Sequence, residues 1–319
     1  MPRAHRIAIL AYEGCQLLDV TGPAAVFGAA NEGRERPVYD VQIVSPDGGA
    51  VASNCGVALM SRRIGGRYDT LLVAGGSRGL KAVMAREDVR RWLRKAAPQT
   101  KRFGSVCTGA FVLAAAGLLD GRRVATHWAS CQRLAEKFPA LTVDADALYV
   151  VDGKVWTSAG VTTGIDMALA LVEADLGAAT ANLIARHFVL YARRPGYQSQ
   201  FSPLLQVQTD ADAPFARLIE WMQAHLDEPL DVPALAARAG LAERSFHRKF
   251  VEETGKTPAH FVEGLRLDAA RTLLAKGLPL KTIAGRVGLR SSARLGQAFE
   301  RRFGMAPSLF REMHAASVA

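Results

Sequence analysis

Apolar and polar positions follow two different patterns along the chain. Over residues 5 to about 190, short apolar runs alternate with helical patterns, as in RIAILA, YDVQIVS, TLLVAGG and RFGSVC, each followed by turn or helix signals. Such alternation predicts an α/β domain of flavodoxin-like type, with a mostly parallel sheet covered by helices. Residues 19–30 and 161–176 are expected to be two of these helices. The Asp152-Gly153 pair inside LYVVDGKVWTS predicts one antiparallel hairpin.

From about residue 212 onward the apolar positions recur at helical spacing, and the same pattern occurs twice. The matching positions are Leu235, Ala236, Arg238, Gly240, Leu241, Phe250, Gly255, Pro258 and Phe261 in the first copy, and Ile283, Ala284, Arg286, Gly288, Leu289, Phe299, Gly304, Pro307 and Phe310 in the second. The early matches are 48 residues apart (283 minus 235) and the late ones 49 (299 minus 250), so one residue is inserted in the second copy. A short helix, a Gly-containing turn and a second helix form the helix-turn-helix signature.

This repeat predicts an all-α domain over residues 212–319, with helix-turn-helix motifs at about 231–253 and 279–302. Between the motifs, residues 258–276 are expected to form one long helix, because their apolar positions keep helical spacing until a Gly and a Pro end it. A Pro-Gly pair and polar residues break the helical pattern over residues 191–211. That segment is therefore predicted to link the α/β domain, residues 5–190, to the helical domain.

In each motif the second helix has an inner apolar face and an outer polar face. Phe246 and Phe250 are four residues apart and predict the buried face in the first motif, as Leu295 and Phe299 do in the second. The expected N-cap residues are Asp231 and Ser291. The outward positions are candidates for DNA contact: Arg244, His247 and Arg248 in the first motif, and Ser292, Ala293, Gly296 and Gln297 in the second.

About the last 90 residues closely resemble the AraC/XylS family of transcription regulators, for which the duplicated Gly-x2-Pro sequence is specific. The resemblance implies that both second helices enter successive major-groove segments on one face of promoter DNA. It also implies base contacts from the outward residues just named. Many relatives carry Arg where Gln297 stands. Because Arg to guanine is the commonest specific contact, we expect weaker base readout by the second motif.

The composition of the chain agrees with a nucleic-acid partner. The formal net charge is +10 and the pI is about 9.8, which suits a polyanion. From Leu280 onward, seven Lys or Arg residues are balanced by two Glu residues. The opening residues lack the long apolar core and cleavage site of a signal peptide, and no apolar run approaches the length of a membrane span. We therefore expect a cytoplasmic protein with no membrane partner.

Cys107 has a distinctive context, because it ends an apolar strand pattern and begins an alanine-rich helix in GSVCTGAFVLAAAGLLDG. This arrangement predicts a nucleophile elbow at the carboxyl edge of the sheet, where the helix dipole would lower the pKa of the thiol and favour thiolate. The other three cysteines, Cys15, Cys55 and Cys131, are expected to be buried and inert. The four cysteines show no metal spacing and no dense disulfide framework, so no metal or other cofactor is expected.

Residues 5 to about 185 resemble the PfpI-like branch of the class I glutamine amidotransferase superfamily. LLDVTGPAAVF, SVCTGAFVLAAAGLLDGRRVATHW and SAGVTTGIDMALALVE are particularly close to isonitrile hydratases. The resemblance implies that Asp19, Cys107 and Thr108 line a reaction centre. PfpI-type peptidases have His where Thr108 stands, so their Cys-His dyad is absent, and no feature identifies a glutaminase-type His and Glu. The candidate ligand-binding residues are Asp19, Gly75, Gly76, Cys107, Thr108 and His127.

Together these features predict a sequence-specific DNA-binding transcription regulator and not an enzyme. The resemblance implies that the α/β domain senses a small, nitrogen-containing metabolite and mediates homodimerisation, and a contact with RNA polymerase stays open. One alternative is an isonitrile-hydratase-like enzyme fused to a DNA-binding domain, with Cys107, Asp19 and Thr108 in catalysis. Another is a redox sensor that acts through oxidation of Cys107, since exposed thiols of low pKa are the susceptible ones.

Overall fold

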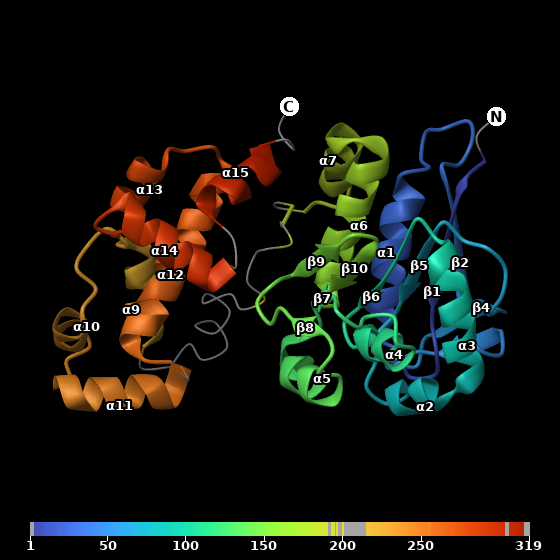
Figure 1. Ribbon diagram of the computed structural model, residues 1–319, viewed down its shortest axis with the longest axis horizontal. Helices are drawn as coiled ribbons and strands as arrows, with labels where there is room; N and C mark the ends of the chain where they lie inside the picture. The colour runs from blue at the N-terminus through green and yellow to red at the C-terminus, as the bar shows by residue number, and fades with distance from the viewer. Residues whose placement is uncertain are drawn as a thin grey trace. The chain divides into compact units, whose positions relative to one another are not determined.

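Figure 1 presents the computed structural model of the chain, which describes residues 3–190, 193, 194, 196, 200, 215–254, 256–303 and 306–315. The chain divides into two compact units, Met1–Gln200 and Phe201–Ala319. The first unit combines a sheet with helices and the second is helical. The predicted fold classes are therefore confirmed.

The first unit contains an eight-stranded sheet with the order β3-β4-β2-β1-β5-β6-β10-β9. Its strands are β1 (His5–Leu10), β2 (Tyr39–Ser45), β3 (Gly49–Ala52), β4 (Ala58–Arg63), β5 (Thr70–Val73), β6 (Arg102–Val106), β9 (Tyr149–Asp152) and β10 (Val155–Ser158). The pairs from β4 to β10 are parallel, and the edge pairs β3–β4 and β9–β10 are antiparallel. All residues of β5 and β6 are buried, which explains why such strands appear in the sequence as continuous apolar runs. The mostly parallel sheet and the hairpin at Asp152-Gly153 are confirmed.

Helices cover both faces of this sheet: α1 (Leu17–Ala29), α2 (Leu80–Ala85), α3 (Glu87–Ala96), α4 (Gly109–Ala115), α5 (Cys131–Lys137), α6 (Thr162–Leu176) and α7 (Ala178–His187) (Figure 1). Helix α6 packs on α1 and α7, whereas α4 packs on α2 and α3. From β1 the sheet extends to β2 in one direction and through β5 to β6 in the other. The connections after β1 and β5 therefore turn toward opposite faces. Such a switch point, at the carboxyl ends of the strands, is where α/β sheets bind ligands.

The sequence patterns do not predict β3, β4, β7 (Arg123–Val124) or β8 (Thr142–Val143). Strands β3 and β4 form an edge hairpin in which most side chains are exposed, so neither strand has a continuous apolar face. Strands β7 and β8 pair with each other over two residues each, which is too short to show any period. Two short 3-10 helices, Ala97–Gln99 and Trp128–Ser130, complete the unit.

The second unit contains α9 (Ala216–Ala224), α10 (Val232–Arg238), α11 (Glu243–Thr254), α12 (Pro258–Ala275), α13 (Leu280–Arg286), α14 (Ser292–Phe303) and α15 (Pro307–Ala315). Helices α10 and α11 form the first helix-turn-helix, α13 and α14 form the second, and α12 is the predicted single helix between them (Figure 1). The glycines of the Gly-x2-Pro sequences, Gly255 and Gly304, lie outside the described residues. No helix in the described part of the chain has the length and apolarity needed to cross a membrane.

The inserted residue of the second copy lies in its turn. The first helices of the two motifs begin 48 residues apart, at Val232 and Leu280 (280 minus 232), and the second helices begin 49 apart, at Glu243 and Ser292 (292 minus 243). The turn glycines, 48 residues apart, both have a φ of 66°, a left-handed conformation that favours glycine. The extra residue therefore follows the glycine and precedes the second helix.

Most of the expected linker, residues 191–211, lies outside the described residues. Its described members contact the first unit. Arg194 forms an ion pair with Asp166, with 2.6 Å between Nη2 and Oδ2, and Gln200 Nε2 donates to the carbonyl of Thr126 at 3.0 Å. The linker boundaries stay a prediction.

Candidate functional site

Cys107 lies in the turn between β6 and α4, as the elbow pattern predicts. Its φ of 57° is left-handed, which costs about 1–3 kcal/mol for a residue that carries a side chain. The neighbouring loops approach it closely: a Cβ on Gly75 would lie 2.6 Å from the Cys107 Cβ, and a Cβ on Gly160 only 2.3 Å. Both positions therefore need glycine, and Cys107 is held between the loops that follow β5 and β10.

Asp19 lies in the first turn of α1, and its side chain is completely buried. One carboxylate oxygen accepts a hydrogen bond from the Gly75 amide at 3.0 Å, and the other accepts one from the Val161 amide at 2.7 Å. Burial raises the pKa of Asp19 to about 6, while these two amides and the Cys107 thiol limit the rise. Asp19 thus ties together the loops on either side of Cys107 and places a carboxylate behind the thiol.

The expected lowering of the Cys107 pKa is wrong. Burial and the negative charge of Asp19 raise the pKa of this thiol to about 12. Helix α4 has seven residues, and the dipole of so short a helix does not outweigh the loss of solvation. A carboxylate with a pKa of about 6 is too weak a base to deprotonate such a thiol. Cys107 is therefore a thiol at neutral pH.

Thr108 is held by the loop after β5. Its Oγ1 donates to the carbonyl of Gly76 at 2.8 Å and accepts from the Gly76 amide at 2.9 Å. These bonds occupy the hydroxyl on one residue of the β5 loop. Thr108 thereby fixes this loop against the elbow, at the position where PfpI-type peptidases would have a histidine.

The other cysteines are free, and they divide by exposure. Cys15 and Cys131 are buried as expected, and burial raises the pKa of both thiols. Cys55 is exposed, so its expected burial is wrong. It lies in the connection between the edge strands β3 and β4, where little packs over the chain.

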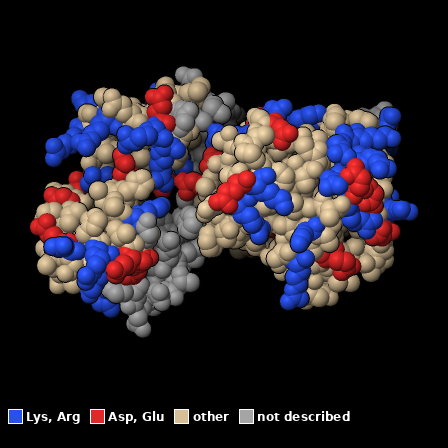
Figure 2. All heavy atoms as spheres, turned by 60° about the horizontal axis from the view of Figure 1, so that its bottom comes forward, with Lys and Arg blue, Asp and Glu red and all other residues tan. Residues whose placement is uncertain are grey.

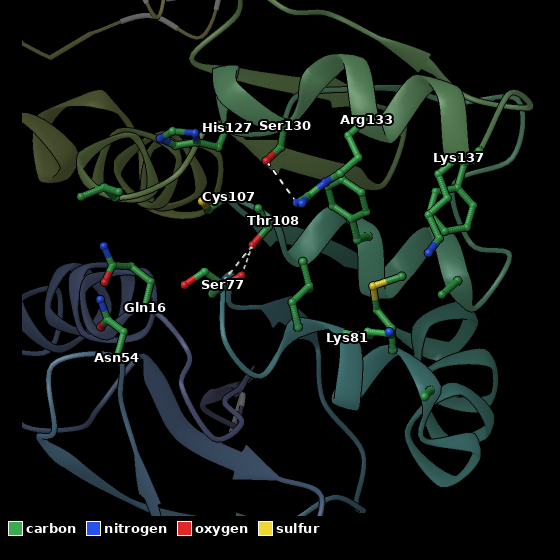
Figure 3. Close-up of a pocket in the computed structure, with 18 of the residues that line it drawn as sticks. Gln16, Asn54, Ser77, Lys81, Cys107, Thr108, His127, Ser130, Arg133 and Lys137 are labelled. Carbon is green, nitrogen blue, oxygen red and sulfur yellow. Dashed lines mark hydrogen bonds between the residues drawn. The ribbon is translucent and has the colours of Figure 1, made fainter.

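A cavity of about 980 Å³ opens beside Cys107 (Figure 3). Of the candidate ligand-binding residues, Gly76, Cys107, Thr108 and His127 line the cavity, whereas Asp19 and Gly75 do not. Burial lowers the pKa of His127, whose Nδ1 accepts from the Ala129 amide at 3.3 Å. The remaining wall is formed by Gln16, Asn54, Ser77, Leu80, Lys81, Met84, Ala85, Arg90, Phe111, Ala115, Ser130, Arg133, Lys137, Phe138 and Val161. The structure thus brings a polar elbow and an apolar wall into one cavity of a size that suits small organic ligands.

In the second unit, the candidate DNA-contacting residues occupy the faces that the repeat predicts. Phe246, Phe250, Leu295 and Phe299 are completely buried. The outward residues Arg244, His247, Arg248, Ser292, Ala293 and Gln297 are exposed, and Gly296 is half-buried. Each motif therefore presents one free helical face.

The charge distribution alone does not select those faces. On the face shown in Figure 2, Lys and Arg side chains are spread over both units with Asp and Glu between them. Arg248 has a carboxylate 3.9 Å away, on Glu252, but both side chains are largely exposed. Such a pair contributes about 0.2–1 kcal/mol at most and leaves Arg248 available to another anion.

The two units match two known families. Residues 5–174 match the DJ-1/PfpI family, and residues 235–313 match a helix-turn-helix domain. The chain belongs to the DJ-1/PfpI family. The DJ-1/PfpI unit is joined in one chain to a DNA-binding domain of AraC type.

Known relatives share both parts. The chain is 34% identical over 278 residues to the HTH-type transcriptional regulator CdhR of Pseudomonas aeruginosa, covering 85% of this chain and 81% of that protein. It is 30% identical over 312 residues to the HTH-type transcriptional regulator GlxA of Rhizobium meliloti, covering 96% of this chain and 95% of that protein. A solved THiJ/PfpI family protein from Pseudomonas syringae is 25% identical, with a TM-score of 0.54 over 69% of this chain and 86% of the other. This DJ-1/PfpI chain is therefore a DNA-binding transcription regulator of AraC type rather than an enzyme.

Sequence reasoning missed most of the cavity wall of the DJ-1/PfpI unit. Lys81 comes from α2, and Arg133 and Lys137 come from α5 (Figure 3). These helices are short and far apart in the sequence, and each has the charged outer face of an ordinary surface helix. The spacing of Arg133 and Lys137, four residues apart, is the one available signal that both side chains lie on one helical face.

Proposed function

We propose that this regulator senses a small, nitrogen-containing metabolite in the cavity beside Cys107 and responds by changing how it binds promoter DNA. The observation that carries the proposal is the position of the cavity, at the carboxyl ends of β5 and β6 in a chain that also has two helix-turn-helix motifs. The nitrogen-containing class rests on the resemblance described above. The ligand contacts we propose are Asp19, Gly75, Gly76, Cys107, Thr108 and His127.

The DNA contacts we propose come from α11 and α14. They are Arg244, His247 and Arg248 in the first motif, and Ser292, Ala293, Gly296 and Gln297 in the second. We propose that the protein acts as a cytoplasmic homodimer, with the DJ-1/PfpI domain in the dimer contact and RNA polymerase as a further partner. The metabolite would favour the arrangement in which both motifs meet DNA, because a ligand shifts an equilibrium only toward the state that it binds better.

The protonated state of Cys107 supports a binding role over the two alternatives. Isonitrile hydration by a nucleophilic cysteine needs a thiolate or a base that forms one. Oxidation of a sensor cysteine also proceeds from the thiolate. Asp19 does not supply such a base, since its pKa of about 6 lies far below the thiol pKa of about 12.

The test of this role is the Cys107→Ser variant. We expect the variant to keep metabolite-dependent regulation in cells, because a hydroxyl preserves the size and polarity of the elbow side chain. A thermal-shift screen of amines and amino acids with the wild-type protein identifies the metabolite, since a ligand that binds only the native state raises the melting temperature. Isonitriles offered to both proteins provide the control. Turnover by the wild type that disappears in Cys107→Ser would make the protein an enzyme.

A second test addresses DNA. We expect the full chain to bind its promoter with a marked salt dependence, because each neutralised phosphate adds about 0.9 to the slope of log K against log salt. Fluorescence anisotropy at several salt concentrations measures this slope. Binding that stays constant from low to moderate salt would contradict DNA recognition by these helices.

A further inference from the structure

The cavity wall of the DJ-1/PfpI unit carries positive charge without negative charge. Its charged side chains are Lys81, Arg90, Arg133 and Lys137, and among the described residues that line the cavity none is Asp or Glu. Figure 3 shows Lys81 and Lys137 on one side of the view and Cys107 and Thr108 on the other. The cations thus lie away from the elbow, where α2 and α5 form the two sides of the cavity.

Three of these four cations have no ion pair. Arg90 is neutralised by Glu87, with 2.6 Å between Nη2 and Oε2. Within the described part of the chain, Lys81, Arg133 and Lys137 have no carboxylate partner. The one hydrogen bond of Arg133 is a long one, 3.4 Å from Nη2 to the Ser130 hydroxyl. These groups are therefore available to an anion that enters the cavity.

An apolar surface lies next to the cations. The rings of Phe111 and Phe138 pack edge to face with centroids 6.4 Å apart. The Arg133 guanidinium lies 4.9 Å from the centre of the Phe111 ring, and the Lys137 ammonium lies 6.0 Å from that of Phe138. Arg133 and Lys137 are one helical turn apart on α5, so both project from the same face. This part of the cavity combines a surface for a hydrocarbon body with donors for a negative charge.

We propose that this end of the cavity, formed by Lys81, Arg133 and Lys137 beside Phe111 and Phe138, binds the negatively charged group of an organic acid. The inference rests on the proposed sensing function and specifies its ligand: the effector is an acid and not a plain amine. Its nitrogen-bearing end lies toward Cys107, where the Asp19 carboxylate is the nearest buried charge.

The physical reason is the asymmetry of charge along the cavity. Cations gathered on a concave surface of low dielectric produce a positive potential there, because the protein wall focuses the field. Asp19 contributes negative charge behind the elbow. A molecule with a positive or neutral end and an anionic end matches this field in one orientation, which provides both affinity and polarity of binding.

The test uses two fluorescent probes that differ by one charged group. One is 8-anilinonaphthalene-1-sulfonate, and the other is N-phenyl-1-naphthylamine, which is the same molecule without the sulfonate. We expect the full-length protein to bind the sulfonate at least about tenfold more tightly, because each contact with an exposed cation adds about 0.2–1 kcal/mol. Fluorescence titration at fixed ionic strength measures both affinities.

Substitutions locate the effect. Arg133→Gln and Lys137→Gln should each weaken sulfonate binding about two- to fivefold, and the double variant about tenfold, while binding of the neutral probe stays unchanged. Lys95→Gln on α3 is the matched control, since Lys95 is exposed and does not line the cavity. Equal affinity for the two probes, no binding of the sulfonate, or equal losses in Lys95→Gln and Arg133→Gln would each overturn the proposal.

A second arm separates this proposal from the sensing function itself. Glycine betaine and choline share a trimethylammonium group, but only the first carries a carboxylate, and each is tested for displacing the sulfonate probe and for changing DNA binding. We expect glycine betaine to displace the probe at lower concentration than choline. If choline competes as well or better, the anion site is wrong, even where DNA binding responds. If the acid displaces the probe and no metabolite changes DNA binding, the anion site stands and the sensing function fails.

Discussion

The two helix-turn-helix motifs use the same framework. In the first motif the rings of Phe250 and Phe261 meet edge to face with centroids 5.3 Å apart, and in the second Phe299 and Phe310 meet in the same way at 5.4 Å. The repeated Phe and Pro positions of the sequence thus correspond to one contact, between the second helix of each motif and the helix that follows it. The repetition conserves the packing that orients the outward face.

Around this shared contact the two motifs are stabilised differently. The first adds aromatic packing, because Phe215 contacts both Phe246 and Phe250 with centroids 5.4 and 5.3 Å apart. The second has Leu295 in place of Phe246 and attaches α14 to α12 by ion pairs. Those pairs are Arg301 with Glu263 at 2.6 Å and Arg302 with Asp268 at 3.3 Å.

The outward faces differ in the same sense. The first motif presents long side chains that donate hydrogen bonds, Arg244, His247 and Arg248. The second presents Ser292, Ala293 and Gly296, with Gln297 as its one long side chain. We interpret the first motif as the main reader of base sequence and the second as a platform that positions the protein on the phosphate backbone. Duplicated folds can therefore keep their packing while dividing the work of recognition.

The largest expected effect tests the shared packing. Phe250→Ala and Phe299→Ala should each cost about 3–5 kcal/mol of unfolding free energy, because both rings are completely buried. Hydrogen exchange of peptides from α10 to α15 in the full chain measures the loss, with peptides of the DJ-1/PfpI unit as internal reference. Leu309→Ala is the control, since Leu309 is 50% exposed. Loss of protection limited to the mutated motif would show that the two motifs fold independently.

Most of the fold and half of the site could be predicted from the sequence. The Phe246–Phe250 spacing, the duplicated glycines and the strand-to-helix turn at Cys107 are local features, and local features are what sequence patterns record. The pKa of Cys107 was predicted in the wrong direction, because it depends on burial and on Asp19, which is 88 positions away (107 minus 19). The cationic wall was missed for the same reason, since Lys81 and Arg133 meet only across the folded cavity.

A smaller effect tests the division of recognition. Arg248→Ala should cost about 1–3 kcal/mol in binding to the promoter, if this guanidinium makes a bidentate contact with guanine, and it should relax base preference in one half of the site. Gln297→Ala should cost less, because the rest of its face offers few hydrogen-bond donors. Anisotropy titrations with promoter and random DNA measure both. Equal losses on the two DNAs would assign Arg248 to a phosphate, and a larger loss for Gln297→Ala would reverse the roles of the motifs.

The smallest effect concerns helix caps, which the two motifs place in opposite positions. In the first motif Asp231 caps the first helix by accepting from the Ala234 amide at 3.0 Å, and in the second Ser291 caps the second helix by accepting from the Arg294 amide at 3.2 Å. The corresponding residues, Pro279 and Ala242, have no side chain that accepts a hydrogen bond.

Ala242→Ser would give α11 the cap that α14 already has. The carbonyls of Ala242 and Ser291 both accept the first helical bond, from Phe246 at 2.8 Å and Leu295 at 3.0 Å, so the two positions are equivalent in the backbone. We expect Ala242→Ser to stabilise the first motif by about 0.5–1 kcal/mol and Ser291→Ala to destabilise the second by a similar amount. Hydrogen exchange of α11 and α14 measures both changes. No gain in Ala242→Ser would mean that the inserted residue in the second turn, and not the serine alone, creates the capping geometry.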